Sequence, residues 1–579
     1  MGGKQDSGAN LRALGLAVLC ACLLACTTIA LIFCVGFREI SWLAQAGLVQ
    51  YAVSWLAVAL VFVVGTWAGY RVLKYGPGRI EKASSKNPWP WMTLSFEKTS
   101  ILKAFAVIFI CWTPFLILQY PCAMNEDAYN QLYQFQTSFP TYYTTLGVTF
   151  DASFIDHHPV FDTLVFGTFL ALGDLLGSQN LGLFFYALTQ SALAALVLAF
   201  SCCYLERLGV PKPWRLLCLA FCALFFIIPL WTATMVKDSL FAVFFVLFFL
   251  LYIEAFRSEG AAFERKGFIA LFAATAVLCA LTKKPGFYIV VLSLLVLTLF
   301  FVRKKAWKPV AAVLVLVPLV HSLLFPLLLY PAIGGVEPGG RQESLGFALQ
   351  QVVTVMRGEN DLSAEEQSAV DAVLDTQRAL EKYNPASVDP VKNSVKPGAS
   401  AQDYRNFLSA YVSIGVRHIP EYTFSVFSTS AAMLCPGVKL TYYTSPEQRD
   451  AWVERFEKAD AKGELHLTFF KPEAIKDANL AFQKAFYTIA DLPGFNVILS
   501  KGLFGAWIPI ICIVLSLWGG RRFLVAYAPI LFSVLLIILS PVVSTRYIIP
   551  LLFTTVLSLG LLCYALVASQ KKGSGKHAA

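Results

Sequence analysis

The stretch KDSLFAVFFVLFFLLYIEAFR, residues 237–257, decides the fold. It carries no charge between Asp238 and Glu254, and an α-helix needs about 20 apolar residues to cross a bilayer. Similar runs recur along the chain, which is 57% hydrophobic and only 14% charged, with a mean hydropathy of +0.64. This composition lies far from that of a soluble domain. The pattern predicts an all-α, polytopic membrane protein.

Clusters of Lys and Arg between the apolar runs set the orientation. The positive-inside rule places these clusters in the cytoplasm, so the formal charge of +10 reports basic cytoplasmic loops and not nucleic-acid binding. About twelve spans result, with both chain ends cytoplasmic. The predicted spans are residues 13–37, 44–70, 101–120, 181–204, 215–232, 239–256, 267–283, 286–302, 309–330, 503–518, 523–541 and 547–568.

Residues 159–176 are the one apolar segment that breaks this scheme. If they crossed the membrane, the cluster Arg207/Lys212/Arg215 would lie outside. We therefore predict a non-crossing helix, which also explains how Asp162 and Asp174 are tolerated there. The predicted parts are two N-terminal spans with a basic loop (1–100), a membrane core (101–330) with a first outer loop (121–180), an outer, mostly helical insert (331–502) and the C-terminal spans (503–579).

Local signals locate helices in both outer segments. A helix starting near Asn125 places Asp127, Gln131 and Gln134 in one polar stripe, which suits a helix lying in the membrane interface. In the insert, Ser363 and Glu366 form a capping box. A further helix is expected at 401–418, and residues 421–434 are apolar enough to rest against the membrane. Outside the reducing cytoplasm, Cys122 and Cys435 are candidates for a disulfide.

The first outer loop is acidic, with no Lys or Arg between Ala104 and Glu206. Translocation explains the missing bases. It does not explain acids beside a membrane, where charge is costly unless it is solvated or used. Asp127 is the strongest candidate for a catalytic carboxylate, with Glu126 as its helper. Gln131, Asp156, His157 and His158 are candidates for orienting a substrate.

Four cations stand at the outer ends of predicted spans, against the positive-inside trend. They are Lys237, Lys283, Lys284 and Arg546. A stray base at a helix end is usually a snorkelling side chain. Cations at three separate hairpins on one face instead predict an anionic ligand in the outer leaflet, such as the phosphate of a lipid carrier.

Acids and cations on one face suit a transfer reaction. A carboxylate near the acceptor acts as general base, and cations stabilise a phosphate leaving group. A divalent metal is a rival reading, with Glu126, Asp127 and Asp156 as candidate ligands.

Five short motifs follow one another along the chain: Asn125-Glu126-Asp127, His157-His158-Pro159, Lys237-Asp238-Ser239, Thr282-Lys283-Lys284-Pro285 and Arg546-Tyr547 with Pro550. In these motifs and their order the sequence resembles the GT-C superfamily of membrane glycosyltransferases, which includes protein O-mannosyltransferases and lipid A aminoarabinose transferases. The insert carries Arg341-Gln342-Glu343 and Tyr383-Asn384-Pro385 with Asp389-Pro390, through which it resembles a bacterial branch of that superfamily.

The resemblance implies sugar transfer from a polyprenyl-phosphate-linked donor, with inversion, at the outer face of a bacterial plasma membrane. Asp127 would take the proton of the acceptor, which is a glycan, a lipid or a protein. Lys237, Lys283, Lys284 and Arg546 would hold the donor phosphate, with Asp238, Arg341 and Tyr547 as further candidates. No cofactor beyond the lipid-linked donor and, as an alternative, a divalent metal is expected.

Three other functions stay open from the sequence. A transporter or lipid flippase usually carries polar residues near mid-membrane and internal repeats. A non-catalytic protein of envelope assembly or surface binding would use 331–502 as its binding module. A ligase or polymerase acting on lipid-diphosphate-linked glycans would share the same architecture.

Overall fold

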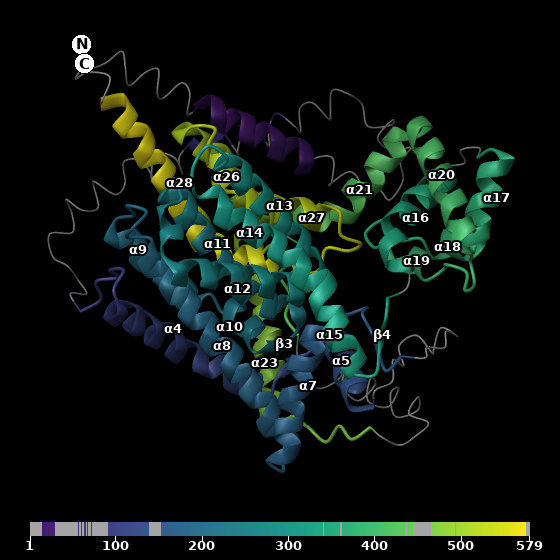
Figure 1. Cartoon of the computed structure of the whole chain (residues 1–579), viewed down its shortest axis with the longest axis horizontal. Helices are drawn as coiled ribbons and strands as arrows, with labels where there is room; N and C mark the ends of the chain where they lie inside the picture. The colour runs from purple at the N-terminus through teal and green to yellow at the C-terminus, as the bar shows by residue number, and fades with distance from the viewer. Residues whose placement is uncertain are drawn as a thin grey trace.

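The structure is a computed structural model that describes residues 14–28, single positions between 56 and 71, and residues 91–574 apart from 138–151, 340, 359–361, 435–437, 444–464 and 493. The predicted span 44–70 therefore lies almost wholly outside the described residues, as does Cys435. The described part is predominantly helical, and its strands are two-residue pieces (Figure 1).

Five of the described helical segments are long and apolar enough to cross a membrane. They are α4 (Lys98–Leu118), α8 (Gln179–Tyr204), α11 (Lys237–Arg257), the continuous run of α14 (Trp307–Pro318), η2 (Leu319–Leu324) and α15 (Phe325–Ala332), and α28 (Thr545–Ser574). Shorter apolar helices are Leu14–Thr28, α12 (Lys266–Thr282), α13 (Lys284–Phe300), α27 (Ala528–Ile538) and the run Leu503–Gly519, formed by η3 (Leu503–Trp507), α25 (Ile508–Ser516) and η4 (Leu517–Gly519).

The chain is thus an all-α protein with several helices of membrane-spanning length, at the positions expected from the sequence. The short elements between them are η1 (Ala261–Glu264), α24 (Phe495–Ile498) and α26 (Phe523–Ala526). Two expected spans are interrupted. Residues 215–232 form the end of α9 (Lys212–Leu224) and α10 (Ile227–Thr232), separated where Phe225 takes an extended conformation. Residues 523–541 form α26 and α27, separated at Tyr527.

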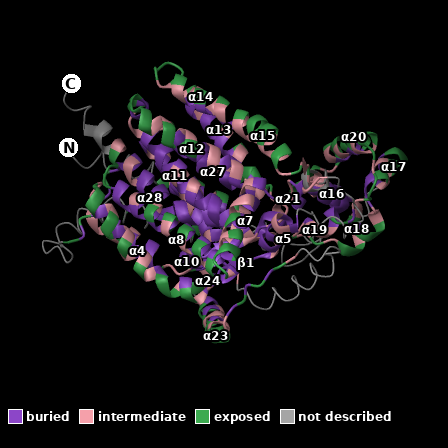
Figure 2. Ribbon diagram, turned by 60° about the horizontal axis from the view of Figure 1, so that its bottom comes forward, coloured by how far each residue is buried: buried purple, intermediate pink, exposed green. Residues whose placement is uncertain are grey.

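Helix α11 lies at the centre of the bundle, and α14–η2–α15 lies at its edge (Figure 2). The apolar window of α11 is 89% buried, whereas that of Trp307–Ala332 is only 11% buried. A helix that is apolar all round and unburied by protein needs lipid around it. The exposed surface of the run α14–η2–α15 is therefore of the kind that suits contact with lipid.

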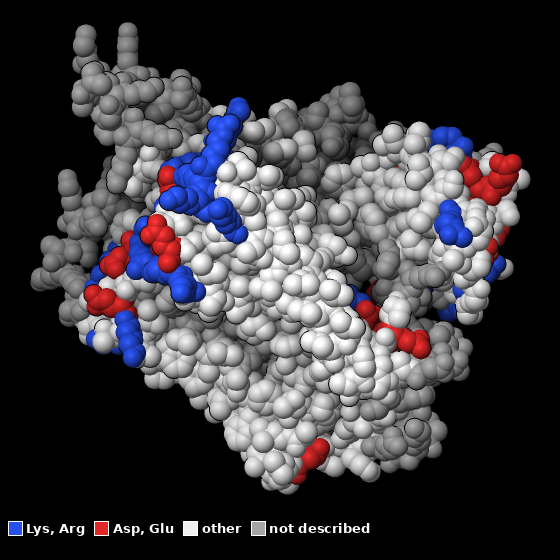
Figure 3. Space-filling model, viewed as in Figure 1, with Lys and Arg blue, Asp and Glu red and all other residues white. Residues whose placement is uncertain are grey.

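Basic side chains from several of the loops that were predicted to share one side of the membrane lie together at one end of the bundle. Arg207 and Arg257 both pair with Glu254, at 3.4 and 2.8 Å. Lys304 and Arg522 both pair with Glu259. In Figure 3, charged side chains gather at one end of the visible face and on the insert, with a broad, mostly uncharged surface between them.

Helix α7 (Val160–Leu175) stays at the opposite end of the bundle. It forms a hairpin with the first turns of α8, where Phe166 packs on Tyr186. Further along α8, Gln190 reaches the carbonyl groups of Thr232 and Thr234, immediately before α11 begins. Helix α7 therefore lies near the start of α11 and does not run toward Arg257, as a non-crossing helix should; its relation to the membrane stays a prediction.

Replacing Gly182 by Ala should destabilise the α7–α8 hairpin. A Cβ at Gly182 would lie 2.2 Å from the carbonyl oxygen of Phe169 and 2.6 Å from the nitrogen of Gly173. Overpacking of this kind costs about 1–3 kcal/mol. Gly267→Ala in α12 is the matched control, because its Cβ would meet no atom within 4 Å. Thermal unfolding in detergent should show a lower midpoint for Gly182→Ala alone; equal midpoints would contradict this packing.

The helix that follows Asn125 differs from the expected interfacial helix. Helix α5 (Glu126–Thr137) starts as predicted, with the Asn125 side chain accepting the N–H of Ala128 at 3.1 Å. Its polar stripe is not open to the interface, since Gln131 is fully buried. Helix α7 covers one side of α5, and Phe469 stacks on Tyr129. These covering segments are distant in sequence, so periodicity alone could not place them.

The insert contains a small hydrophobic core of its own, which includes Leu349, Val370 and Phe407. The predicted capping box is present, because Ser363 and Glu366 exchange hydrogen bonds of 3.0 and 3.2 Å. The helices of the insert are α16 (Arg341–Arg357), α17 (Ala364–Val373), α18 (Thr376–Lys382), α19 (Asp389–Lys392), α20 (Ala401–Arg417) and α21 (Ile419–Leu434), followed by α23 (Glu473–Ala490) beside α4.

Candidate functional site

A short parallel pairing brings the acidic motif to the first outer cation. Strand β1 (Ala123–Met124) pairs with β3 (Thr234–Met235), with Met124 opposite Met235. Two residues after each strand a helix begins: α5 at Glu126 and α11 at Lys237. The pairing therefore fixes Asp127 and Lys237 side by side, although 110 positions separate them in the sequence.

A second parallel pairing positions the histidine motif. Strand β2 (Phe154–Ile155) pairs with β4 (Val336–Glu337) at the start of the insert. Asp156 then accepts the N–H of Gly339 at 2.5 Å and the ammonium of Lys284 at 3.3 Å. His158 follows and is buried beside Lys237.

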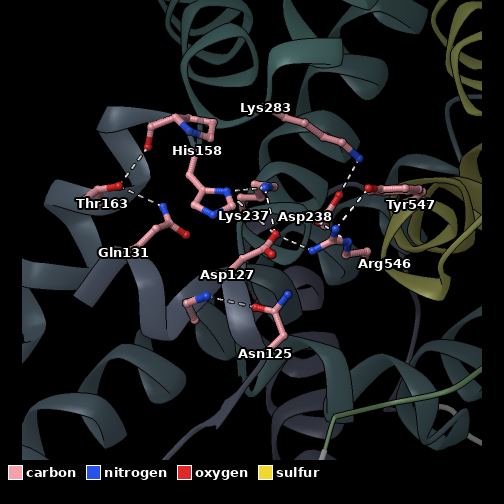
Figure 4. A network of polar contacts seen from close by, with 12 residues as sticks. Asn125, Asp127, Gln131, His158, Thr163, Lys237, Asp238, Lys283, Arg546 and Tyr547 are labelled. Carbon is pink, nitrogen blue, oxygen red and sulfur yellow. Dashed lines mark hydrogen bonds and ion pairs between the residues drawn. The ribbon is translucent and has the colours of Figure 1, made fainter. Parts of the chain in front are cut away.

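Asp127 is the centre of a charged network, drawn in Figure 4. Its Oδ2 atom accepts from Lys237 Nζ at 2.9 Å and also from the guanidinium of Arg546. Lys237 Nζ lies 2.9 Å from His158 Nδ1 as well. A charged lysine only donates, so Nδ1 accepts and the His158 proton resides on Nε2. The three predicted site groups, Asp127, Lys237 and Arg546, thus meet at one carboxylate oxygen.

A second acid–cation pair, Asp238 with Lys283, lies next to the pair of Asp127 with Lys237. Asp238 is fully buried, and its Oδ1 atom lies 2.6 Å from Lys283 Nζ. The Lys283 ammonium also lies 5.0 Å from the ring centroid of Tyr547. Arg546 connects the two pairs, because its Nε atom lies 3.9 Å from Asp238 Oδ2. Three cations and two acids therefore form one continuous cluster.

These groups stand at the N-terminal ends of helices. Glu126 begins α5, Lys237 begins α11, Lys284 begins α13, and Thr545 begins α28 directly before Arg546. Helix N-termini carry partial positive charge and unpaired N–H groups, which attract anions. The helix N-termini and the cations therefore both favour the binding of a negatively charged ligand.

The cluster borders a cavity of about 540 Å³. At the polar end, Glu126, Asp127 and Lys237 contribute to the wall. Further along the helices the wall is mostly apolar, formed by Phe241, Ile289, Leu536, Ile537 and Pro550 together with Ser533. The cavity is thus amphipathic, with a charged head region and an apolar channel between α13, α27 and α28.

The insert closes the polar end of this cavity. Asp389, Lys392 and Asn393 line it from α19 and the residue that follows. The backbone N–H of Val388 donates to the carbonyl of Pro541 at 2.9 Å, in the loop that leads to Arg546. In the sequence, only Asp389 belongs to a motif, Asp389-Pro390; Lys392 and Asn393 belong to none.

Burial and neighbouring charges shift the protonation of the site. Burial would raise the pKa of Asp127, but the charges of Lys237 and Arg546 outweigh it and hold that pKa well below its usual value. Burial and the Lys237 charge lower the pKa of His157 to about 3, and the same causes lower the pKa of His158. At neutral pH, Asp127 is ionised and both histidines are neutral.

The free energy of unfolding should therefore fall as the pH drops from about 6.5 toward 3. In this window the unfolded chain binds protons at both histidines, while the folded chain keeps them neutral. The stabilisation is complete above the unfolded pKa and is lost as the pH falls. Thermal unfolding midpoints across this range measure the effect. The double variant His157→Gln/His158→Gln should show a flatter profile, and an unchanged profile would contradict the assignment.

The other predicted residues lie at varied positions. Glu126, His157, Lys284 and Tyr547 line the cavity together with the central cluster. Gln131 does not line it; its amide donates to Thr163 at 3.1 Å instead. Arg341 begins α16, and its side chain lies outside the described atoms.

A further acid, Asp162, is buried in α7. Asp162 is fully buried without a hydrogen-bond partner in the described part of the chain, and burial raises its pKa well above the usual value. In the sequence, Asp162 stands out only as a charge within the apolar segment 159–176.

Among the described residues, no three His, Cys, Asp or Glu side chains gather as metal ligands would. Cys122 is buried, and its predicted partner lies outside the described residues.

Residues 7–577 match a protein family described as "Family of unknown function (DUF6020)". The chain belongs to the DUF6020 family. No curated protein and no solved structure matches it. Because the match runs through almost the whole chain, the cavity, the cluster and the insert of this DUF6020 protein all lie inside the region that defines the family.

Proposed function

We propose that this DUF6020 protein is a membrane glycosyltransferase that moves a sugar from a polyprenyl-phosphate-linked donor to an acceptor outside the cytoplasm. The observation that carries the proposal is the shared oxygen of Asp127, which binds Lys237 and Arg546 at the mouth of an amphipathic cavity. A carboxylate and phosphate-binding cations at one point are the two groups that such a transfer requires.

The polar end of the cavity suits the donor phosphate. Lys237, Lys283 and Arg546 supply three positive charges within one cluster. The N-termini of α11, α13 and α28 add partial positive charge in the same region. Arg546 can grip two phosphate oxygens with its planar fork, while the lysines act as point charges.

The apolar end suits the lipid tail. Ile289 of α13, Leu536 of α27 and Pro550 of α28 line the channel below the charged cluster. A prenyl chain is a long hydrocarbon, so burying it against these side chains is favourable. The order of a charged region and an apolar channel matches a phosphate attached to a prenyl tail.

Asp127 acts as the base only after the donor has bound. Lys237 and Arg546 bind its carboxylate and lower its basicity. A donor phosphate competes for the same two cations, and a carboxylate that loses them regains its proton affinity. Donor binding therefore frees the base at the moment when it is needed.

The transfer then follows in one displacement. Asp127 accepts the proton of the acceptor hydroxyl, and the acceptor oxygen forms a bond to the anomeric carbon. The bond from that carbon to the phosphate oxygen breaks, and polyprenyl phosphate leaves with the electron pair. The cations stabilise the charge that develops on the leaving oxygen. A single displacement inverts the anomeric configuration.

The proposal includes a GT-C-like architecture with about twelve spans and the site on the extracytoplasmic face of a plasma membrane. Its support is the separation of charges along α11, with Lys237 in the cluster at one end and Arg257 among the basic loops at the other. Cysteine-accessibility labelling at residues 177–180 tests the orientation. Labelling only from the cytoplasm would contradict it.

The direct test is an assay with purified protein in lipid nanodiscs. A radiolabelled polyprenyl-phosphate sugar serves as donor, and an envelope extract supplies acceptors. Label should move from the prenyl lipid to an extract component, and the Asp127→Asn variant should transfer about 10²–10⁴-fold less. If the donor binds but no member of a panel of hexose and pentose donors is consumed, the proposed activity is wrong.

A further inference from the structure

A second cavity adjoins the main one on the lipid-facing side of the bundle. We call it the side cavity; it has a volume of about 260 Å³ and lies between the start of α7, the junction of α12 with α13, and the run η2–α15. Pro159 and Lys284 border both cavities. A molecule in the side cavity would therefore lie next to the space beside Asp127.

The walls of the side cavity are rich in aromatic rings. Phe161, Phe287, Tyr288, Phe325 and Tyr330 all contribute. The ring centroids of Phe161 and Phe325 lie 6.5 Å apart. Aromatic walls with a few polar groups are typical of sites for small organic ligands. The volume lies just below the usual range for drug-sized ligands, about 300–1,000 Å³, so it suits one head group.

Polar groups stand inside the apolar run that reaches this cavity. His321 stacks on Phe287 with centroids 4.5 Å apart, and its Nδ1 atom lies 3.1 Å from Ser322 Oγ. Both residues lie on η2, a π-helical turn directly after Pro318. Polar residues within membrane segments and π-helical turns both occur preferentially at functional sites. His321 and Ser322 play no part in the main cavity.

The charge of the side cavity differs from that of the main one. Its single lysine and single aspartate, Lys284 and Asp156, pair with each other at 3.3 Å. No surplus of cations is therefore left for a phosphate. Ser322, Tyr330 and His321 offer hydroxyl and imidazole groups that both donate and accept hydrogen bonds. The polar end of the ligand should be uncharged and rich in hydroxyl groups.

The edge of the cavity faces lipid. Leu327 and Leu328, on α15, are 64% and 69% exposed. Tyr288 is 55% exposed at the cavity wall. A ligand with an apolar chain can thus enter sideways from the bilayer and keep its chain among lipids.

We propose that the side cavity binds the uncharged, hydroxyl-bearing head group of a membrane lipid, and that this lipid is the sugar acceptor. The second half of the statement rests on the proposed glycosyltransferase function. Lys284 borders both cavities, and its pair with Asp156 is partly exposed, at 50% for the lysine and 33% for the aspartate side chain. Exposed ion pairs are weak, so this pair can open and admit a hydroxyl group to Asp127.

The binding test uses an alkyl glucoside with a photoreactive diazirine beside the sugar. After irradiation of the full-length protein, cross-links should concentrate on the residues that line the side cavity. An excess of unlabelled alkyl glucoside should remove them, whereas alkyl phosphate and free glucose should not. Cross-links spread evenly over the lipid-facing surface would overturn the site, and full competition by free glucose would overturn its assignment to a lipid.

A matched pair of variants makes the binding test specific. Ser322→Trp narrows the mouth of the side cavity and should reduce the cross-links at least fivefold. Leu323→Trp is the control, because Leu323 is the next residue, is 53% exposed and does not line the cavity. Equal cross-linking of both variants would overturn the site.

Transfer assays separate the two proposals. Ser322→Trp should bind polyprenyl phosphate normally and transfer at least tenfold less sugar to lipid acceptors than Leu323→Trp does. If cross-linking succeeds but the wild-type protein transfers no sugar, the site stands and the proposed activity fails. If Ser322→Trp transfers at the wild-type rate, the activity stands and the acceptor assignment fails.

Discussion

Asp127→Asn is expected to lower sugar transfer by about 10²–10⁴-fold, the usual contribution of a general base, and at the same time to tighten the binding of polyprenyl phosphate. Asparagine keeps the shape of the side chain but cannot accept the proton. It also removes the negative charge that pairs with Lys237 and Arg546. The two cations then meet the phosphate without an internal competitor.

The two effects should be measured separately. Transfer is followed with the radiolabelled donor, and binding with polyprenyl phosphate alone. A gain of about 1.4 kcal/mol would appear as a tenfold lower Kd. Asp174→Asn is the matched control, since Asp174 is an exposed acid of α7 that does not line the cavity. Weaker phosphate binding by Asp127→Asn would indicate that Asp127 only positions the cations, and undiminished transfer would remove it as the base.

Arg546→Gln is expected to weaken polyprenyl phosphate binding by about 30-fold to several thousand-fold, because truncating one member of a buried charge pair costs about 2–5 kcal/mol. Arg546 contacts Asp127 and approaches Asp238, so its loss leaves both acids with one cation each. Arg546→Lys should recover part of the affinity, since lysine restores the charge but not the two-point grip.

Binding of polyprenyl phosphate to detergent-purified protein tests this expectation without any acceptor. Arg522→Gln is the control, because Arg522 pairs with Glu259 at the basic end of the bundle. Thermal unfolding of each variant separates a loss of affinity from a loss of fold. If both Arg546→Gln and Lys237→Ala bind the phosphate normally, the cations do not form the donor site.

Several features of this fold follow from local sequence. The length and apolarity of residues 239–256 predict a membrane-spanning helix, and α11 is long and apolar enough to be one. Ser363 and Glu366 predict a helix start, because a capping box satisfies backbone groups within one turn. Four cations stand at span ends where the positive-inside rule disfavours Lys and Arg. Their position predicts an anionic ligand nearby, and that ligand stays a prediction.

Other features had no local signal. Periodicity describes one helix at a time, so it could not show that α7 and Phe469 would bury the polar stripe of α5. It could not place α19 of the insert against the cavity, because that contact depends on Val388 meeting the loop at Pro541. The side cavity was equally hidden, as its walls come from α7, α12, α13 and the run η2–α15.

The sequence by itself determined that this is a helical membrane protein and which residues carry its charges at the ends of the predicted spans. Only the tertiary structure decided that Asp127 and two cations, Lys237 and Arg546, share one oxygen atom across 110 and 419 positions of chain. The physical reason is that the length of an apolar run is a property of one helix and can be read from consecutive residues. The charged cluster instead depends on the pairing of β1 with β3 and on the packing of α11 against α28.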